Sequence, residues 1–386
     1  MLIDCDKVRK NDNTLKGFFE LLKGGLWENM VCLSTDGKVD WDAIYRVAQE
    51  QSVLGLVMAG LEHSDVKPPQ TILLQWIGEL QLVEQRNNSM NAFVAELIER
   101  LRDAGVYALL VKGQGVAQCY ERPLWRSSGD VDLLLSQVNY HKSIDCLSNV
   151  ASSVDDEISY KLHKAMTISS WDVDLHGSLR SGLWEKLDRV IDEMQDEVFC
   201  AGAVRSWMNG RTQVFIPRAD EDVVFVFAHI LQHFYRGGIG FRQICDWCRL
   251  LWTYKDAINR GLLEKRIRKM GVMNEWKSFA MLAVKYLGMP IDAMPFYSPL
   301  GKWIRKAERL MDLILEMGNF GHSRIGYQQT KPVLLRKAIT LWIFTKDNFR
   351  QLFISPINPF RVWYNLIRIK LFKRYGNPLS NASISK

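Results

Sequence analysis

Apolar residues recur at helical spacing through most of the first hundred positions. Asp40 is a typical helix N-cap, and apolar residues follow it at intervals of three and four to about Leu61. After two prolines, helix-favouring residues run from Gln70 to Asp103, where Asn87 and Asn88 could interrupt the helix. The pattern predicts a largely helical N-terminal region.

Short apolar runs replace the helical pattern in the middle of the chain. Residues 106–111 and 131–135 are mostly aliphatic runs of strand length, bounded by polar residues or glycine. From 157 to 175 apolar and polar residues alternate loosely, which predicts two or three strands that include a hairpin. Residues 214–216 are one further candidate strand, and a short helix is expected over 140–150.

Helical spacing returns from Arg218 to near the end of the chain. The first of these helices opens with acids, which favour a helix N-terminus, and Gly237-Gly238 ends it. Further helices are predicted over 241–254, 274–287, 302–317, 334–353 and 359–375. The predicted fold class is therefore α+β: a small mixed β-sheet core at 105–217, flanked by helical regions at 1–104 and 218–386.

Length and composition are those of an ordinary globular protein. The chain has 386 residues, which at about 150 residues per domain suggests two or three folding units. Hydrophobic residues make up 47% and charged residues 24%, which argues against a largely disordered chain. No apolar run approaches the length of a membrane-spanning helix, and the first residues mix acids and bases, unlike a signal peptide. We therefore expect a cytoplasmic protein without a transmembrane segment.

The positive charge is concentrated at the C-terminal end. From Lys331 to Lys386 there are eleven Lys or Arg and one acid, so this tail carries +10, while the net charge of the whole chain is +7. Interleaved bases and aromatic residues are typical of a surface that contacts a membrane or nucleic acid peripherally, or of a packed helix pair. The packed pair is favoured, because aromatic residues at helical spacing usually mark a core. The aromatic residues are Trp342, Phe344, Phe349, Phe353, Phe360, Trp363, Tyr364 and Phe372.

The cysteines are scattered, odd in number and mostly in apolar surroundings, which predicts reduced, buried thiols. His229 and His233 lie four apart on a predicted helix and could combine with Cys245 and Cys248 in a zinc site. These two cysteines, however, fall in an apolar helical segment without the usual loop geometry. Buried free cysteines and helix-packing histidines are therefore favoured. The cysteines are Cys5, Cys32, Cys119, Cys146, Cys200, Cys245 and Cys248.

Two acids share one face of the predicted strand in Gly129-Asp-Val-Asp-Leu-Leu-Leu135. Strand side chains alternate, so Asp130 and Asp132 point the same way, roughly 6.5 Å apart. At an effective dielectric of about 20, two carboxylates at that distance repel by about 2–3 kcal/mol, which a cation between them would relieve. Oxygen ligands of this kind suit Mg²⁺. The alternative is a strand edge whose acids face solvent.

A glycine-containing turn precedes this strand. Lys112-Gly113-Gln114-Gly115 lies between a predicted strand and a predicted helix, where backbone N–H groups could hold phosphate oxygens. Arg126 offers a planar fork for the same purpose. Lys112 could be a phosphate ligand or merely the polar end of a strand. Arg236 and Arg242 flank a turn between helices that could close over a substrate or simply join them.

The segment Trp171-Asp-Val-Asp-Leu-His176 is a second alternating acidic run. It places Asp172, Asp174 and His176 on one face. A third carboxylate beside the first two would complete a metal site that includes a group able to accept a proton. Alternation alone does not distinguish Asp172 from Asp174. His176 could hydrogen-bond a carboxylate or be a structural histidine, and the structural role is favoured.

Taken in order along the chain, these residues resemble a known family. The set is Lys112-Gly113, Tyr120, Pro123, Arg126, Asp130-Val-Asp132, Val173-Asp174-Leu-His176, His229-x-x-x-His233 and Gly238-Ile-Gly-Phe-Arg242-Gln-Ile-Cys-Asp246. Over about residues 106–247 the sequence resembles the uncharacterised bacterial nucleotidyltransferase family within the DNA polymerase β-like superfamily. The flanking helices match only in general character.

The resemblance implies a mixed sheet with a Gly-Ser-like loop and a divalent metal, Mg²⁺ or Mn²⁺, held by Asp130, Asp132 and Asp174. It implies transfer of a nucleoside monophosphate from an NTP to an unknown acceptor (a small molecule, a protein or RNA), with release of pyrophosphate. Gln114 stands where the superfamily usually has Ser, and Asp174 is preferred over Asp172 from the family match. The expected nucleotide-binding residues are Lys112, Gly113, Gln114, Gly115 and Arg126, and those expected on the substrate side are His176, Arg236 and Arg242.

Three functions are consistent with these features. The first is a metal-dependent nucleotidyltransferase. The second is an RNA-binding or tRNA-modifying protein that uses the basic C-terminal helices. The third is a catalytically silent scaffold, which the presence of all three carboxylates argues against. The enzyme is therefore the expected function.

Overall fold

Seven strands form one mixed sheet in the part of the chain that the computed structural model describes, residues 12–33, 39–202, 204–318 and 333–372. Their order is β3-β4-β5-β2-β1-β7-β6; β2 pairs parallel with β5, β1 pairs parallel with β7, and the other neighbours are antiparallel. The sheet and its surrounding helices confirm the predicted α+β class. The strands are β1 (Ala108–Val111), β2 (Val131–Leu135), β3 (Ser153–Val154), β4 (His163–Ile168), β5 (Trp171–His176), β6 (Val204–Asn209) and β7 (Thr212–Pro217).

The central strands were predictable and the edge strands were not. The apolar runs at 106–111, 131–135 and 214–216 contain or lie within β1, β2 and β7, and the predicted hairpin is β4–β5. The pattern does not predict β3 or β6, which form the two edges of the sheet. An edge strand buries little of its surface, so its sequence need not alternate clearly between apolar and polar residues.

The two faces of the sheet differ in character: one is apolar, and the other carries the acids of β2 and β5 beside buried apolar residues such as Leu109, Val111 and Leu134. We call the second the polar face. Residues 131, 133 and 135 of β2, and 173 and 175 of β5, are buried against helices α5 (Gln70–Asp103) and α7 (Gln137–Ser148). Because neighbouring side chains on a strand point to opposite faces, Asp132, Asp174 and His176 project from the other side. The packing of the apolar face thus fixes where the acids are presented.

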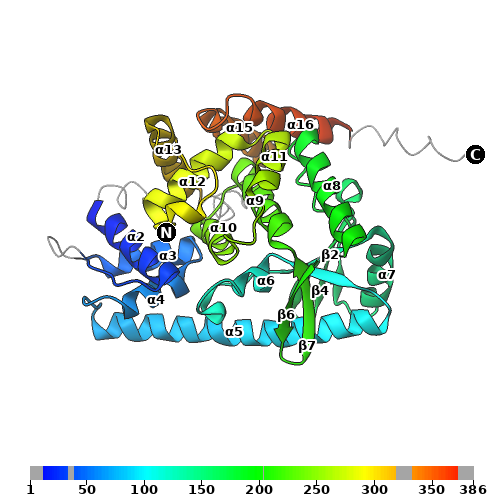
Figure 1. Ribbon diagram of the computed structural model, residues 1–386, viewed down its shortest axis with the longest axis horizontal. Coiled ribbons are helices and arrows are strands. Elements are labelled where there is room, and N and C mark those ends of the chain that lie inside the picture. Colours follow the sequence, from blue (N-terminus) through cyan, green and yellow to red (C-terminus); the bar gives the residue numbers. More distant parts are fainter. Residues whose placement is uncertain (1–11, 34–38, 203, 319–332, 373–386) are drawn as a thin grey trace, which may run out of the picture.

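The longest helix, α5, runs beneath the sheet from the N-terminal helices to α7 (Figure 1). The predicted interruption near Asn87 is wrong, because α5 is continuous over 34 residues. Asn87 is fully buried, and its side-chain amide donates to the carbonyl oxygens of Leu124, at 2.7 Å, and Arg126, at 2.8 Å. The amide is therefore satisfied by a distant loop and does not compete with the helix backbone.

Three shorter helices, α2 (Asp12–Trp27), α3 (Trp41–Glu50) and α4 (Leu54–Glu62), pack at the N-terminal end. Asp40 caps α3 as predicted, accepting a hydrogen bond from the Ala43 N–H at 3.0 Å. The apolar run expected to continue to about Leu61 is divided between α3 and α4. Helices α2 and α4 cross at backbone contact, because a Cβ on Gly60 would overlap the carbonyl oxygen of Leu21.

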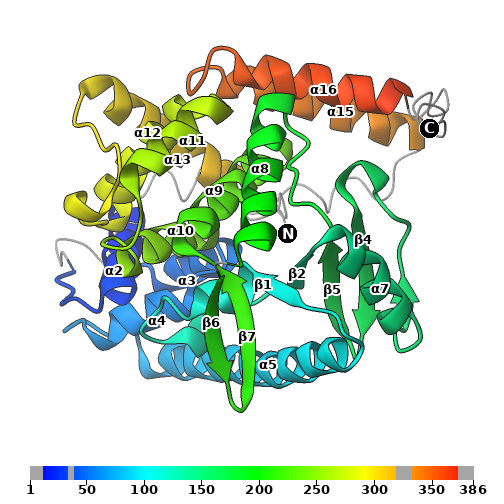
Figure 2. The ribbon, with the colours of Figure 1, turned by 45° about the vertical axis from the view of Figure 1, so that its right-hand side comes forward.

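Further helices, among them α8 (Glu185–Ala201), α9 (Ala219–Arg236) and α10 (Phe241–Thr253), lie on the side of the sheet opposite α5 (Figure 2). The helices predicted after residue 218 are confirmed within the described residues, including the break at Gly237-Gly238, while residues 373–375 of the last predicted helix lie outside them. One apolar core includes residues from N-terminal and C-terminal helices alike, and the division into three regions stays a prediction. The remaining elements are α6 (Gly113–Ala117), α11 (Arg260–Met270), α12 (Met273–Leu287), α13 (Gly301–Met317), α15 (Val333–Gln351) and α16 (Asn358–Phe372), with short 3₁₀ turns at Pro123–Trp125, Ser159–Lys161 and Ile291–Ala293.

The C-terminal pair α15 and α16 exposes aromatic side chains that were expected in a core. Phe344 and Phe353 do pack against the apolar core. The expectation is wrong for five others: Trp342, Phe349, Phe360, Trp363 and Tyr364 are between 38% and 71% exposed. Contact of this surface with a membrane or nucleic acid stays a prediction. Within the described residues, no helix combines the length and apolar character needed to cross a bilayer.

Candidate active site

Three carboxylates converge on the polar face of the sheet. The parallel pairing of β2 and β5 sets Asp132 directly opposite Asp174, and Asp130 lies two residues before Asp132 on the same side. All three offer oxygens within 4.8 Å of one another. Asp132 is buried, Asp174 half-buried and Asp130 exposed. The structure thus brings together the three acids that the sequence singled out from two separate segments.

Asp172, the alternative third carboxylate, does not belong to this cluster. Its exposed carboxylate accepts a hydrogen bond from the Thr167 hydroxyl at 3.3 Å. The difference between Asp172 and Asp174 comes from the register with β2, in which Asp132 pairs with Asp174. A register between strands distant in sequence cannot be deduced from alternation within one of them.

Lys112 projects into the acidic cluster rather than standing at the solvent end of a strand. Its Nζ donates to Asp132 Oδ1 at 3.0 Å, and the side chain is 18% exposed. Lys112 has a φ of +59° and Gly113 a φ of +41°, so the turn from β1 into α6 contains two successive residues with positive φ. Although burial opposes the charge, the carboxylates of Asp132 and Asp130 raise the pKa of Lys112. Lys112 is therefore an ammonium group fixed beside the carboxylates.

Two histidines flank the carboxylates. His176 Nε2 lies 2.8 Å from Asp132 Oδ1, and His163 Nε2 lies 3.2 Å from Asp174 Oδ2. The sequence analysis favoured a structural role for His176 over a hydrogen bond to a carboxylate, and the structure shows the hydrogen bond. His163 was not singled out in the sequence. It reaches the site because the β4–β5 hairpin pairs it with His176, and the two rings lie 4.8 Å apart.

Negative charge is crowded at the cluster. The charge of Asp132 is the main cause that raises the pKa of Asp130 to about 6. Burial disfavours ionised Asp132, but Lys112 and His176 outweigh it and hold the pKa of Asp132 below its ordinary value. The site therefore holds carboxylates whose mutual repulsion a divalent cation would relieve, and whose oxygens are the ligands that Mg²⁺ and Mn²⁺ prefer. A second group of potential ligands, His163, Asp174 and His176, shares Asp174 with the first.

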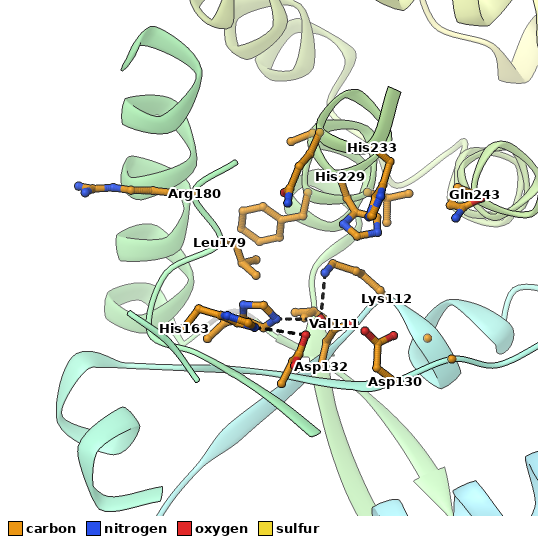
Figure 3. Close-up of a pocket in the computed structure, with 18 of the residues that line it drawn as sticks. Val111, Lys112, Asp130, Asp132, His163, Leu179, Arg180, His229, His233 and Gln243 are labelled. Atoms are coloured by element: carbon orange, nitrogen blue, oxygen red, sulfur yellow. Dashed lines mark hydrogen bonds and ion pairs between the residues drawn. The ribbon is translucent and has the colours of Figure 1, made fainter. Parts of the chain in front are cut away.

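A cavity of about 350 Å³ adjoins the carboxylates and concentrates positive charge. Figure 3 shows His229 and His233, both on α9, facing Lys112 across this space. Burial, reinforced by the charge of Lys112, lowers the pKa of His233 to about 4, and burial with nearby Arg236 lowers that of Lys161 to about 8. Bound anions would relieve this crowding of bases. The Lys and Arg residues that line the cavity are Lys112, Arg126, Lys161, Arg180, Arg236 and Arg242.

Arg236 and Arg242, expected either at the substrate side or simply at a helix junction, both line this cavity. Arg236 donates from Nη2 to the carbonyl oxygen of Gly182 at 2.8 Å. Arg242 donates from Nη1 to that of Ser127 at 3.0 Å. These bonds fix both guanidinium groups at the cavity wall. Their contact with a substrate stays a prediction.

Arg126 lines the cavity but is already paired. Its Nε and Nη2 each donate to a carboxylate oxygen of Asp246 at 2.7 Å, and Tyr120 donates to the same carboxylate at 2.7 Å. Although burial opposes the charge, the carboxylate of Asp246 raises the pKa of Arg126. This geometry gives Arg126 a structural partner that its place in the sequence did not reveal. Its contact with a nucleotide stays a prediction.

The other residues of the predicted phosphate-binding turn divide between the cavity and the core. Gly113 lines the cavity. Gln114 is buried and turns away toward α5, where its Nε2 donates to Asn91 Oδ1 at 2.7 Å. Gly115 faces β7, since a Cβ there would lie 3.1 Å from the Ile216 side chain. A role of Gln114 or Gly115 in binding phosphate stays a prediction, without support from these contacts.

The cysteines take no part in a metal cluster within the described residues, because both groups of potential ligands consist of His and Asp. Cys119, Cys245 and Cys248 are buried free thiols as expected, and burial raises the pKa of all three. Cys32 and Cys200 are exposed, contrary to expectation. Cys5 lies outside the described residues.

Several cavity residues carried no signal in the sequence. Lys161, Ser178 and Arg180 come from segments around the β4–β5 hairpin, and Gln232 comes from the same helix as the two histidines. Single polar residues near strand ends are common, and only the assembled sheet shows which of them face the acids. The spacing of His229 and His233 places them on one face of a helix, and the structure shows that this face lines the cavity, whereas helix packing was the favoured expectation.

Comparison with known proteins agrees with this geometry. Residues 37–288 match a family model described as "Uncharacterised nucleotidyltransferase". Neither the curated proteins nor the solved structures gave a match. The matched segment contains the whole sheet, all three carboxylates and both histidine pairs. Because it covers well over half of the sequence, the chain belongs to the uncharacterised nucleotidyltransferase family.

Proposed function

We propose that the protein is a divalent-metal-dependent nucleotidyltransferase of the DNA polymerase β-like type, which transfers a nucleoside monophosphate from an NTP to an acceptor. The observation that carries the proposal is the convergence of three carboxylate groups within 4.8 Å, next to a cavity lined by bases. In a member of a nucleotidyltransferase family, this pairing matches the two needs of the reaction, a cation site and a place for phosphates.

The carboxylates fit a resident Mg²⁺ or Mn²⁺. Asp130, Asp132 and Asp174 would hold it, because their oxygens lie within 4.8 Å of one another and carboxylates are the ligands that these cations prefer. When bound, such a cation neutralises charge on the reacting phosphate and orients its oxygens.

The residues of the chain would position the reactants. The basic cavity would receive the triphosphate, with Lys112 beside the carboxylates. The acceptor oxygen would bond to the α-phosphorus while the bond from that phosphorus to the bridging oxygen breaks and pyrophosphate leaves. Asp174 would take the proton of the acceptor hydroxyl, and His163 and His176 would hold the orientations of Asp174 and Asp132.

The direct test is pyrophosphate release with each NTP, Mg²⁺ and candidate acceptors. The double variant D130N/D132N is expected to lose all turnover, whereas D156N, which changes an exposed acid outside the cavity, should keep it. A second measurement does not depend on turnover: Mg²⁺ or Mn²⁺ should raise the Tm of the wild type and leave that of D130N/D132N unchanged. Full turnover in the double variant would refute the proposal.

A further inference from the structure

A second, larger cavity of about 860 Å³ meets the same carboxylates. It shares four lining residues with the first, namely Gly129, Asp130, Asp174 and Arg242. Its other walls come from the end of α3, from α5, and from the strands β3, β4 and β5. A group transferred at Asp130 and Asp174 can therefore be approached from two cavities, and transfer between two substrates needs two binding places.

The two cavities differ in charge. The first is lined by six Lys or Arg and four Asp. The second is lined by two Arg against five acids, which are Glu50, Asp130, Asp155, Asp172 and Asp174. Complementary potential favours ligands of opposite charge. The first cavity thus suits a triphosphate, and the second disfavours any polyanion.

Both arginines of the second cavity are already engaged. The Arg86 guanidinium lies 4.8 Å from the centre of the Trp171 ring, which in turn stacks on Phe93. Arg242 donates to the Ser127 carbonyl oxygen. Glu50, Asp155 and Asp172 are exposed within the cavity wall. With two Arg against five acids, the lining of this cavity carries a net negative charge.

Hydroxyl groups supply most of the remaining polar lining, with Ser52, Ser128, Ser153 and Thr167 spread around the wall. Such groups can both donate and accept hydrogen bonds, as the hydroxyls of a small polar molecule require. Met166 and Ala165 are the apolar side chains of the wall, so a lipid tail would find little surface. The lining therefore favours a hydroxylated ligand over an apolar one.

We infer that the second cavity binds the acceptor, and that the acceptor is a small hydroxylated molecule carrying a positively charged amine. This inference rests on the proposed function. An acceptor hydroxyl would bond to the α-phosphorus of the NTP in the first cavity, its proton passing to Asp174 and pyrophosphate leaving. The amine would lie near Glu50, Asp155 and Asp172, and RNA is disfavoured as the acceptor at this site.

The test is calorimetric binding in the presence of Mg²⁺ and a non-hydrolysable NTP. The probes are glucosamine and a diamino sugar. Each is compared with the matching sugar that has hydroxyl in place of amine, with the phosphate of that matching sugar, and with a short single-stranded RNA. The amino sugars should bind more tightly than all others. In E50Q/D155N their Kd should rise by about threefold for each carboxylate lost, hence about tenfold. The matched control D156N should leave it unchanged.

Several results would overturn the inference: tighter binding of the phosphate or RNA, equal binding of amine and hydroxyl sugars, no binding of any amino sugar, or an unchanged Kd in E50Q/D155N. Binding of Mg²⁺ with the NTP is measured in the same proteins. This measurement distinguishes a failure of the proposed function from a failure of the acceptor inference. If the wild type fails to bind the NTP or release pyrophosphate, the proposed function fails. If only the preference for amines is missing, the acceptor inference alone fails.

Discussion

The buried pair of Arg126 and Asp246 allows a quantitative prediction about stability. Their side chains are 6% and 9% exposed, and two bonds of 2.7 Å join the guanidinium to the carboxylate. Replacing Asp246 with Asn keeps the shape but leaves the Arg126 charge buried without a counter-charge. Breaking a buried pair in this way costs about 3–5 kcal/mol. We expect D246N to lower the free energy of unfolding by that amount.

The assay is urea unfolding followed by tryptophan fluorescence for the wild type, D246N, R126M and R126M/D246N. Removing both charges is much less costly than stranding one. The double variant should therefore be more stable than the sum of the single effects predicts, by at least about 2 kcal/mol. A loss below about 1 kcal/mol in D246N, or strict additivity, would refute the reasoning.

Two further predictions concern packing and pH. Gly60→Ala should destabilise the protein by about 1–3 kcal/mol, because the added Cβ overlaps the Leu21 carbonyl oxygen. The control Gly78→Ala, at an exposed position of α5 with open space, should be neutral or stabilising. Equal effects of the two substitutions in urea unfolding would contradict this. Burial raises the pKa of Asp222 to about 6 although Arg205 opposes the shift. The folded state thus holds this proton longer than the unfolded state, so the stability of the wild type relative to D222N should fall as pH rises from about 4 to about 6; a rise would show that attraction to Arg205 dominates.

The sequence predicted those parts of the fold that depend on local patterns. The cap at Asp40, the strand 131–135 and the break at Gly237-Gly238 each follow from residues close together in the chain, and each is confirmed. Helix α8 was missed although its apolar residues do recur at helical spacing, so the signal was present there. The edge strand β6 was missed for a different reason, because none of its residues is fully buried and its apolar residues do not alternate with polar ones.

The site was predictable for acids that share a strand face and not for groups brought in by tertiary structure. Alternation identified Asp130 and Asp132, but only the register between β2 and β5 brings Asp174 to them. His163 depends on a hairpin register, and the partner of Arg126 lies 120 residues away. Arginines expected to bind phosphate look the same in sequence whether they face a cavity or a buried carboxylate.

The continuity of α5 has a consequence for shortening this protein. Near one end, Trp76 stacks on Tyr45 among the N-terminal helices, while the residues from Met90 to Leu101 cover the apolar underside of the sheet. Removing everything before the first strand would therefore uncover that underside and also delete Glu50 from the wall of the larger cavity. The strands that carry the carboxylates are not an independent fragment, and any smaller version intended for crystallisation or screening must retain the helix that supports them.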